Sequence, residues 1–145
     1  EVNMVGTIRT LDADMRETLF ERFRTIVQNT AESNGAEATL SIDQGYPVTY
    51  NDPQLTAMMG STFVEVIGAE NVNSNMNAIT GAEDFSFFQQ EIPGLFFFLG
   101  GMPKGQDPAK AAPHHTPDFY VDDAGMLDGI KLMSRLVVDY AEKVN

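Results

Sequence analysis

The first third of the chain has a pattern of apolar and polar residues that predicts a β-α-β unit. Residues 2–8 are predicted to form a strand, and residues 38–43 alternate strictly between apolar and polar, which predicts a second, half-buried strand. Between them, apolar residues recur at helical spacing from Met15 to Thr30, after Asp12 or Asp14 as the N-cap. We expect a strand, a helix and a strand in that order.

A second helix begins at a start signal, in which Asp52 serves as the N-cap and Pro53 takes the first helical position. Apolar residues from Leu55 to Ile67 form a wide stripe along this helix, which predicts that one broad face is buried. Gly68 ends the helix, as Gly35 ends the first one, because glycine readily adopts the left-handed conformation that closes a helix.

The second half of the chain predicts further strands separated by loops. Residues 78–80 are expected to be extended, and the run from Leu95 to Leu99 is apolar on both faces, as in an inner strand that helices cover on both sides. Residues 102–112 form a loop that is too long for a simple turn and is a candidate binding loop. Strands that alternate with helices indicate the α/β fold class.

A last helix is predicted after Asp122 or Asp123, either of which can serve as its N-cap. Its apolar positions repeat at helical spacing, and we expect them to face inward: Leu127, Ile130, Met133, Leu136, Val137, Tyr140 and Ala141.

The composition excludes several classes of function. Of the 145 residues, 43% are hydrophobic and 21% charged, which is typical of a globular protein. A formal net charge of -12 repels phosphate backbones, so we expect no nucleic-acid partner. No apolar run approaches the roughly 20 residues that cross a bilayer, so we expect no membrane span. Because the chain has no cysteine, any metal must take nitrogen and oxygen ligands.

The first residues of the chain contain neither an initiator Met nor the charged and apolar regions of a signal peptide. Residues 1–5 lead directly into the first predicted strand, so we expect that the sequence is a piece of a longer protein.

The two histidines of the chain are adjacent, at His114 and His115, directly before Thr116 and Pro117. They follow a loop after a buried strand, which is where open α/β sheets bind ligands. Neutral imidazole is a common metal ligand, but a metal site needs about three or four protein ligands. Two interpretations therefore stay open at this point, a pair of solvated loop residues and a metal ligand.

Polar residues at two further places are candidates for binding. Glu83 and Asp84 follow Gly81 and could orient a ligand, or they could form the first turn of a helix that Thr80 or Gly81 caps. Arg9, at the end of the first predicted strand, could bind a carboxylate through its forked guanidinium or could lie on the surface.

Five motifs occur in an order and spacing that resemble the amidohydrolase branch of the twentieth metallopeptidase family, which includes hippurate hydrolases, N-acyl amino acid amidohydrolases and auxin-conjugate hydrolases. They extend over nearly the whole chain: Gly6-Thr7-Ile8-Arg9-Thr10, Gly45-Tyr46-Pro47 with Asn51-Asp52-Pro53, Gly81-Ala82-Glu83-Asp84-Phe85, Pro93-Gly94 with Phe96-Phe97-Phe98-Leu99-Gly100, and Pro113-His114-His115-Thr116-Pro117.

The resemblance implies a fragment of a two-domain α/β enzyme. Residues 1–50 would be half of a ferredoxin-like lid used for dimerisation, and residues 51–145 would be the C-terminal part of an αβα catalytic domain. The full-length protein would be a cytoplasmic homodimer that hydrolyses the amide bond of N-acyl or N-aroyl amino acids with one or two divalent metals, zinc or manganese.

The resemblance also implies roles for single residues. His115 would be a metal ligand, and Arg9, Gly81, Glu83 and His114 would bind substrate. No catalytic residue is expected in this chain, because the general base and the other metal ligands lie in the N-terminal half of family members. The 145-residue chain alone is therefore expected to be inactive.

Two other functions are consistent with the sequence. The β-α-β unit could pair its strand edge with another copy, so that the chain acts as a non-catalytic dimerisation or binding module. The pair His114 and His115 could alone bind nickel or zinc.

Overall fold

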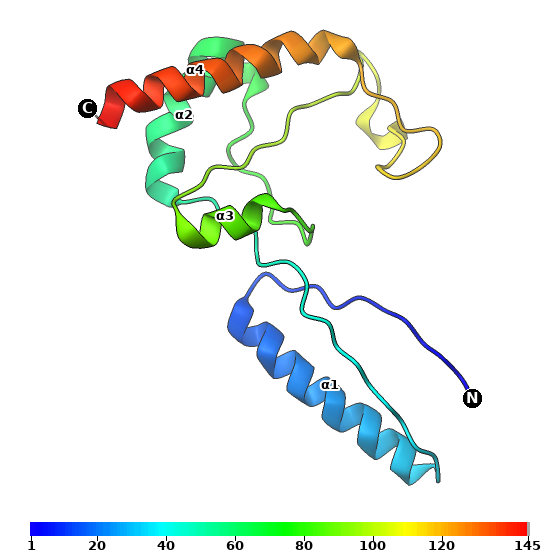
Figure 1. Cartoon of the computed structure of the whole chain (residues 1–145). Coiled ribbons are helices and arrows are strands. Elements are labelled where there is room, and N and C mark those ends of the chain that lie inside the picture. Colours follow the sequence, from blue (N-terminus) through cyan, green and yellow to red (C-terminus); the bar gives the residue numbers. More distant parts are fainter. Residues whose placement is uncertain (145) are drawn as a thin grey trace. The chain divides into compact units, whose positions relative to one another are not determined.

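The computed structural model describes residues 1–144, and the elements in this part of the chain are all helical (Figure 1). Four are α-helices: α1 (Ala13–Ser33), α2 (Pro53–Ile67), α3 (Phe85–Glu91) and α4 (Met126–Val144). Three are short 3-10 helices: η1 (Ala69–Asn71), η2 (Pro108–Lys110) and η3 (Asp123–Gly125). The chain divides into two compact units, residues 1–50 with 77–94 and residues 51–76 with 95–145.

The ends of α1 and α2 lie where the sequence predicts them. Asp12 accepts a hydrogen bond from the Met15 backbone N–H at 2.7 Å, and Asp52 accepts one from Leu55 N–H at 2.7 Å. Gly35 and Gly68 follow the two helices with positive φ values of 68° and 83°. Both start signals and both glycine stops are therefore confirmed.

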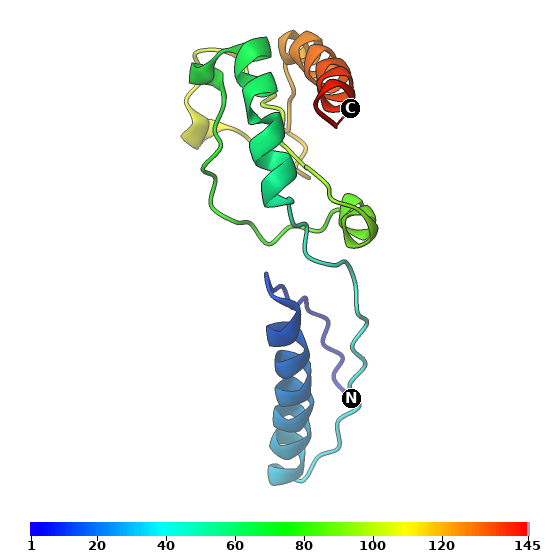
Figure 2. The ribbon, with the colours of Figure 1, turned by 90° about the vertical axis from the view of Figure 1, so that its left-hand side faces the viewer.

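In the first unit, residues 36–50 run alongside α1 in both views (Figures 1 and 2). Ala38, Leu40 and Ile42 are half-buried, whereas the residues between them are exposed. The alternation predicted for this segment is present, so the sequence correctly indicates which face of it packs inward.

The apolar stripe of α1 is not buried in this unit. Phe20 is the buried residue of the helix, whereas Met15, Leu19, Phe23 and Ile26 are between 39% and 61% exposed. The stripe has the helical spacing that the sequence predicts, but the described part of the chain does not cover it.

In the second unit α2 and α4 pack against each other and cross (Figure 2, in which α4 is seen nearly end-on). The stripe of α2 is buried or half-buried, as predicted, with Met59 and Thr62 most deeply buried. Asp122 caps η3, which leads into α4 at Met126. The last helix therefore exists, and Asp122 rather than Asp123 supplies the cap.

The face of α4 that packs differs from the expectation. Leu132 and Asp139 are buried, whereas Ile130, Met133 and Val137 are 65%, 58% and 69% exposed. The prediction that the apolar stripe of α4 faces inward is wrong for this chain. The face of α4 that packs against α2 is instead the one that carries Leu132 and Asp139, and Asp139 accepts a hydrogen bond from Thr62 of α2.

The strands predicted at residues 2–8, 38–43, 78–80 and 95–99 are not formed in the described part of the chain. A strand exists only when a neighbouring strand supplies its hydrogen-bonding partners, and these segments have none along residues 1–144. The chain is therefore rich in helix, and its α/β character rests on sequence pattern alone. None of the described helices has the length and apolar composition needed to cross a bilayer.

Candidate functional site

The loop from Thr80 to Asp84 lies in the first unit, where Arg9 holds its start. The Arg9 Nη1 donates a hydrogen bond to the Thr80 backbone carbonyl at 2.8 Å, across 71 positions of sequence. The structure thus brings Arg9 next to Gly81 as an exposed residue, which agrees with the surface position that the sequence allows. Its other N–H groups remain donors that a ligand can use.

Tyr46 lies at the other end of this loop. The neighbouring Asp84 side chain raises the pKa of Tyr46 above its ordinary value, and desolvation and then the negative charge of Glu83 raise it further. The Tyr46 ring lies 5.7 Å from the Phe87 ring, centroid to centroid. Tyr46 was part of a family motif in the sequence, but no property of the sequence placed it beside Asp84.

The helix that follows the loop begins later than predicted. Asp84 takes the N-cap position of α3, and no side chain caps it, so the expectation that Thr80 or Gly81 is the cap is wrong. Glu83 instead organises the turn. One of its side-chain oxygens accepts from Phe85 N–H at 3.3 Å, and its carbonyl accepts from the buried Ser86 hydroxyl at 2.5 Å.

Gly81 is exposed, and a Cβ added to it would meet no heavy atom within 4 Å. Glu83 is half-buried beside it. A backbone without a side chain at this position leaves its peptide groups open to a ligand, which is the property that the sequence analysis assigned to this glycine.

The two histidines lie in the second unit, in an exposed turn after η2. His115 has φ 64°, the one positive value at a non-glycine residue in the part of the chain described. The turn is closed by the Thr116 hydroxyl, which donates to the Pro113 carbonyl at 2.7 Å, and by Phe119 N–H, which donates to the Thr116 carbonyl at 3.1 Å. The His114 ring packs on Phe119 at 4.7 Å.

This turn can supply a metal with one imidazole but not with a complete set of ligands. The His114 and His115 rings lie 6.3 Å apart and nearly perpendicular, and His114 packs against an aromatic ring. Along residues 1–144, no group of three or more His, Asp or Glu side chains lies close enough to hold a metal ion. The exposed His115 ring has a nitrogen that can bind a divalent metal. The remaining ligands would have to come from residues outside this chain.

A family model described as peptidase family M20/M25/M40 matches residues 4–139. The chain belongs to peptidase family M20/M25/M40. The resemblance drawn from the five motifs is thereby confirmed.

Relatives in this family include several hydrolases. The chain is 29% identical to "Putative amidohydrolase YhaA" of Bacillus subtilis over 94% of this chain and 34% of that protein. It is 31% identical to "IAA-amino acid hydrolase ILR1-like 4" of Arabidopsis thaliana, over 96% of this chain and 32% of the relative. It is also 31% identical to "N-acetyldiaminopimelate deacetylase" of Enterococcus faecalis, over 92% of this chain and 33% of the relative.

The chain thus spans about a third of the length of these M20/M25/M40 relatives. No solved structure matches it. Of the site residues expected from the sequence, Arg9, Gly81 and Glu83 lie in one unit, whereas His114 and His115 lie in the other.

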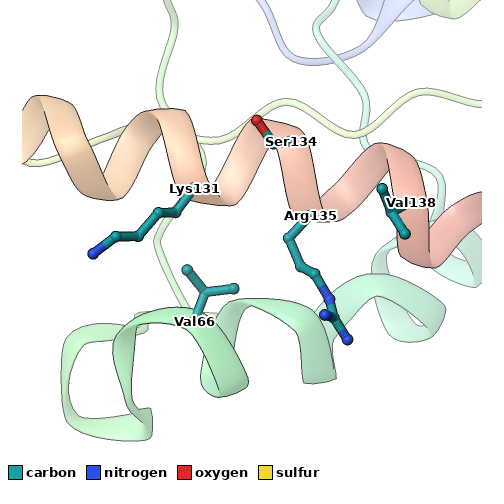
Figure 3. A pocket seen from close by; sticks show the side chains of 5 residues that line it. All are labelled: Val66, Lys131, Ser134, Arg135 and Val138. Carbon is teal, nitrogen blue, oxygen red and sulfur yellow. The ribbon is translucent and has the colours of Figure 1, made fainter.

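A groove of about 450 Å³ lies between α2 and α4, and none of the candidate site residues lines it (Figure 3). Lys131 and Arg135 extend from α4 on either side of Val66. Lys131 pairs with Asp128 at 3.3 Å, and Arg135 pairs with Asp139 and, at 3.9 Å, with Glu65. Because carboxylates neutralise both cations, the groove is a helix-packing seam rather than an anion site in this M20/M25/M40 chain.

Proposed function

We propose that the full-length protein is a metal-dependent amidohydrolase that cleaves the amide bond of N-acyl or N-aroyl amino acids. Family membership supports hydrolysis in general. The substrate class is supported by two relatives, one named for an IAA-amino acid and the other for removing an acetyl group from N-acetyldiaminopimelate. Both names describe an acyl group joined to an amino acid.

The observation that carries the proposal is the backbone of His115. A φ of 64° costs an ordinary residue about 1–2 kcal/mol, and residues with such strained backbones cluster at active sites and ligand-binding positions. One side-chain hydrogen bond and one backbone hydrogen bond of Thr116 hold this turn. We propose that the turn presents the His115 imidazole as a ligand for zinc or manganese.

A bound divalent metal would polarise the amide carbonyl and acidify a bound water. The residues of this chain would bind and orient the substrate. Arg9 has further N–H donors for the amino acid carboxylate, Gly81 offers exposed peptide groups, and the Glu83 carboxylate accepts hydrogen bonds. The His114 ring, packed on Phe119, would line the pocket. The general base and the remaining metal ligands would lie outside the chain.

We further propose that residues 1–50 are half of a ferredoxin-like lid and residues 51–145 the end of an αβα catalytic domain. Extended segments on both sides of α1 that do not pair with each other are consistent with a split β-α-β unit, in which another strand lies between them. The exposed stripe of α1, together with strand-like segments that have no pairing partner in the described residues, supports the proposal that this lid forms a homodimer.

The same stripe favours the second candidate, a non-catalytic dimerisation module. A purely structural module would associate with itself in a concentration-dependent and metal-independent manner, and would hydrolyse nothing.

The deciding experiment assays the full-length protein against a panel of N-acetyl, N-benzoyl and N-indoleacetyl amino acids, with and without a chelator. Hydrolysis that stops on chelation and returns with zinc or manganese supports the enzyme. His115→Ala should remove the bound metal, measured by elemental analysis, whereas His114→Ala should leave it. A protein that keeps its metal without His115 would exclude the assigned ligand, and absence of hydrolysis across the panel would favour the structural module.

A further inference from the structure

The two histidines lie in a loop whose ends are joined by a hydrogen bond. The Asp122 backbone N–H donates to the Gly101 carbonyl at 2.8 Å, so residues 102–121 leave and return near the start of α4 (Figure 1). We call residues 102–121 the histidine loop. His115 lies within it, in the turn that the Thr116 hydroxyl closes. The position of the His115 ring therefore depends on how firmly the two ends of the loop are joined.

Gly101 has no room for a side chain at this closure. A Cβ added to Gly101 would lie 2.9 Å from Val121 Cγ1 and 3.5 Å from Val121 Cγ2, and real Cβ atoms essentially never show the shorter of these distances. Val121 directly precedes Asp122, so its side chain covers Gly101 where the hydrogen bond forms. The φ of Gly101 is not positive, so close approach rather than backbone conformation requires glycine here.

The segments on both sides of this closure are held by further hydrogen bonds. The Asp122 carboxylate accepts from Ala124 N–H at 2.9 Å and caps η3, which leads into α4. On the other side, Phe96 N–H donates to Asn51 Oδ1 and the Phe96 carbonyl accepts from Asn51 Nδ2, each at 2.7 Å. Asn51 lies two residues before α2, and α2 packs against α4. The closure at Gly101 therefore joins two segments that each have a fixed support.

We propose that Gly101 is a positioning residue for His115. Without a side chain, it lets Val121 and Asp122 close the histidine loop, and the closed loop holds the imidazole at the place where it binds a metal. A closed loop has fewer conformations than an open one, so less freedom is lost when His115 binds. The inference rests on the proposed function for its effect on metal binding, whereas the closure itself can be measured without a metal. Gly101 contacts neither metal nor substrate in this assignment.

The structural test is hydrogen exchange of the Asp122 amide in the metal-free, full-length protein. Gly101→Ala should make this amide exchange about tenfold faster, because the new Cβ displaces Val121 and weakens one hydrogen bond. The double variant Gly101→Ala/Val121→Ala removes the two methyl groups that the Cβ would meet, so it should exchange nearly as the wild type does.

Gly100→Ala is the matched control for this test, because a Cβ at the adjacent Gly100 meets no heavy atom within 4 Å. It should leave the exchange of Asp122 unchanged. If Gly101→Ala alone does not fold, the double variant decides, since it must fold with wild-type exchange if Val121 is the group in conflict. Unchanged exchange in Gly101→Ala, or equal acceleration in Gly100→Ala, would overturn the inference.

The second test measures the affinity of the full-length protein for zinc. Gly101→Ala should weaken zinc binding by about tenfold, as is typical when a group that orients a metal ligand is changed. The double variant should recover most of this affinity, and Gly100→Ala should bind zinc as the wild type does. Faster exchange with unchanged zinc affinity would show that the closure does not position His115, which overturns the assignment. If His115→Ala keeps its zinc, the proposed function fails at this ligand, and the exchange result then decides whether Gly101 closes the loop.

Discussion

The Thr62 hydroxyl of α2 donates a hydrogen bond of 2.7 Å to the Asp139 carboxylate of α4, and both side chains are buried. Arg135, one turn before Asp139 on α4, pairs with the same carboxylate. A buried charge with two partners is stable only while both remain, since an uncompensated carboxylate is costly away from water. This polar contact decides which face of α4 meets α2.

Removing the Thr62 hydroxyl should therefore destabilise the second unit. Thr62→Val is nearly isosteric and deletes only the donor, which should cost about 1.5–3 kcal/mol because the bond is made to a charged group. Thr62→Ser keeps the donor, loses one methyl group and should cost about 1 kcal/mol. Urea denaturation midpoints measure both. Equal midpoints for the two variants would show that the hydrogen bond contributes nothing net.

Two glycines near the start of α4 should respond differently to alanine. A Cβ at Gly125 would lie 3.0 Å from the Gly100 backbone carbonyl, whereas a Cβ at Gly129 would lie 2.7 Å from the end of the Leu99 side chain. Backbone cannot move aside easily, but Leu99 is 46% exposed and can rotate. Alanine also stabilises a helix interior by about 1 kcal/mol over glycine.

We therefore expect Gly129→Ala to be neutral or slightly stabilising and Gly125→Ala to be less stable than it by about 1–2 kcal/mol. Thermal unfolding of the two variants side by side checks this order. The reverse order would mean that Leu99 is fixed in place and that the segment around Gly100 is free to shift.

Local signals in the sequence predicted the helices well. The caps at Asp12 and Asp52 and the stops at Gly35 and Gly68 are properties of neighbouring residues, so a single sequence contains them. The half-buried alternation around Leu40 is a local property too. Helix ends and inward faces of this kind can be predicted because they need no distant partner.

Features that depend on distant partners could not be predicted. Segments such as residues 95–99 have the composition of a strand, but their pairing depends on other strands. The face of α4 that packs against α2 is set by the hydrogen bond between Thr62 and Asp139, which are 77 positions apart in the sequence. For the same reason, the motifs pointed to Arg9 and to the loop near Gly81, but only the fold shows that Arg9 reaches Thr80.

The raised pKa of Tyr46 predicts a pH dependence. The pKa of Tyr46 in the folded protein lies above its ordinary value of 10.0, so its contribution to stability is fully present below pH 10 and is lost as the pH rises through the folded pKa. Asp84→Asn removes the negative charge of this side chain, which is one cause of the raised pKa, and it should lower the Tyr46 pKa. The phenolate absorbance of wild type minus Tyr46→Phe isolates this group among the four tyrosines. An unchanged titration in Asp84→Asn would show that Asp84 is not the partner.

The strained backbone of His115 gives a prediction that separates conformation from metal binding. At an ordinary exposed position glycine is less stable than alanine by about 0.5–1 kcal/mol, because it loses more freedom on folding. At φ 64° the order should reverse, with His115→Gly more stable than His115→Ala by about 1 kcal/mol. Chemical denaturation of the metal-free proteins measures this difference.

Asparagine is the matched control at this position, since it tolerates the left-handed conformation and has no imidazole. His115→Asn should keep the stability of the wild-type apo protein but lose the metal in the full-length enzyme, together with chelator-sensitive hydrolysis. If alanine is as stable as glycine at position 115, the turn does not impose the conformation. If His115→Asn retains the metal, the imidazole is not a ligand, and the strain must serve some other contact of the turn.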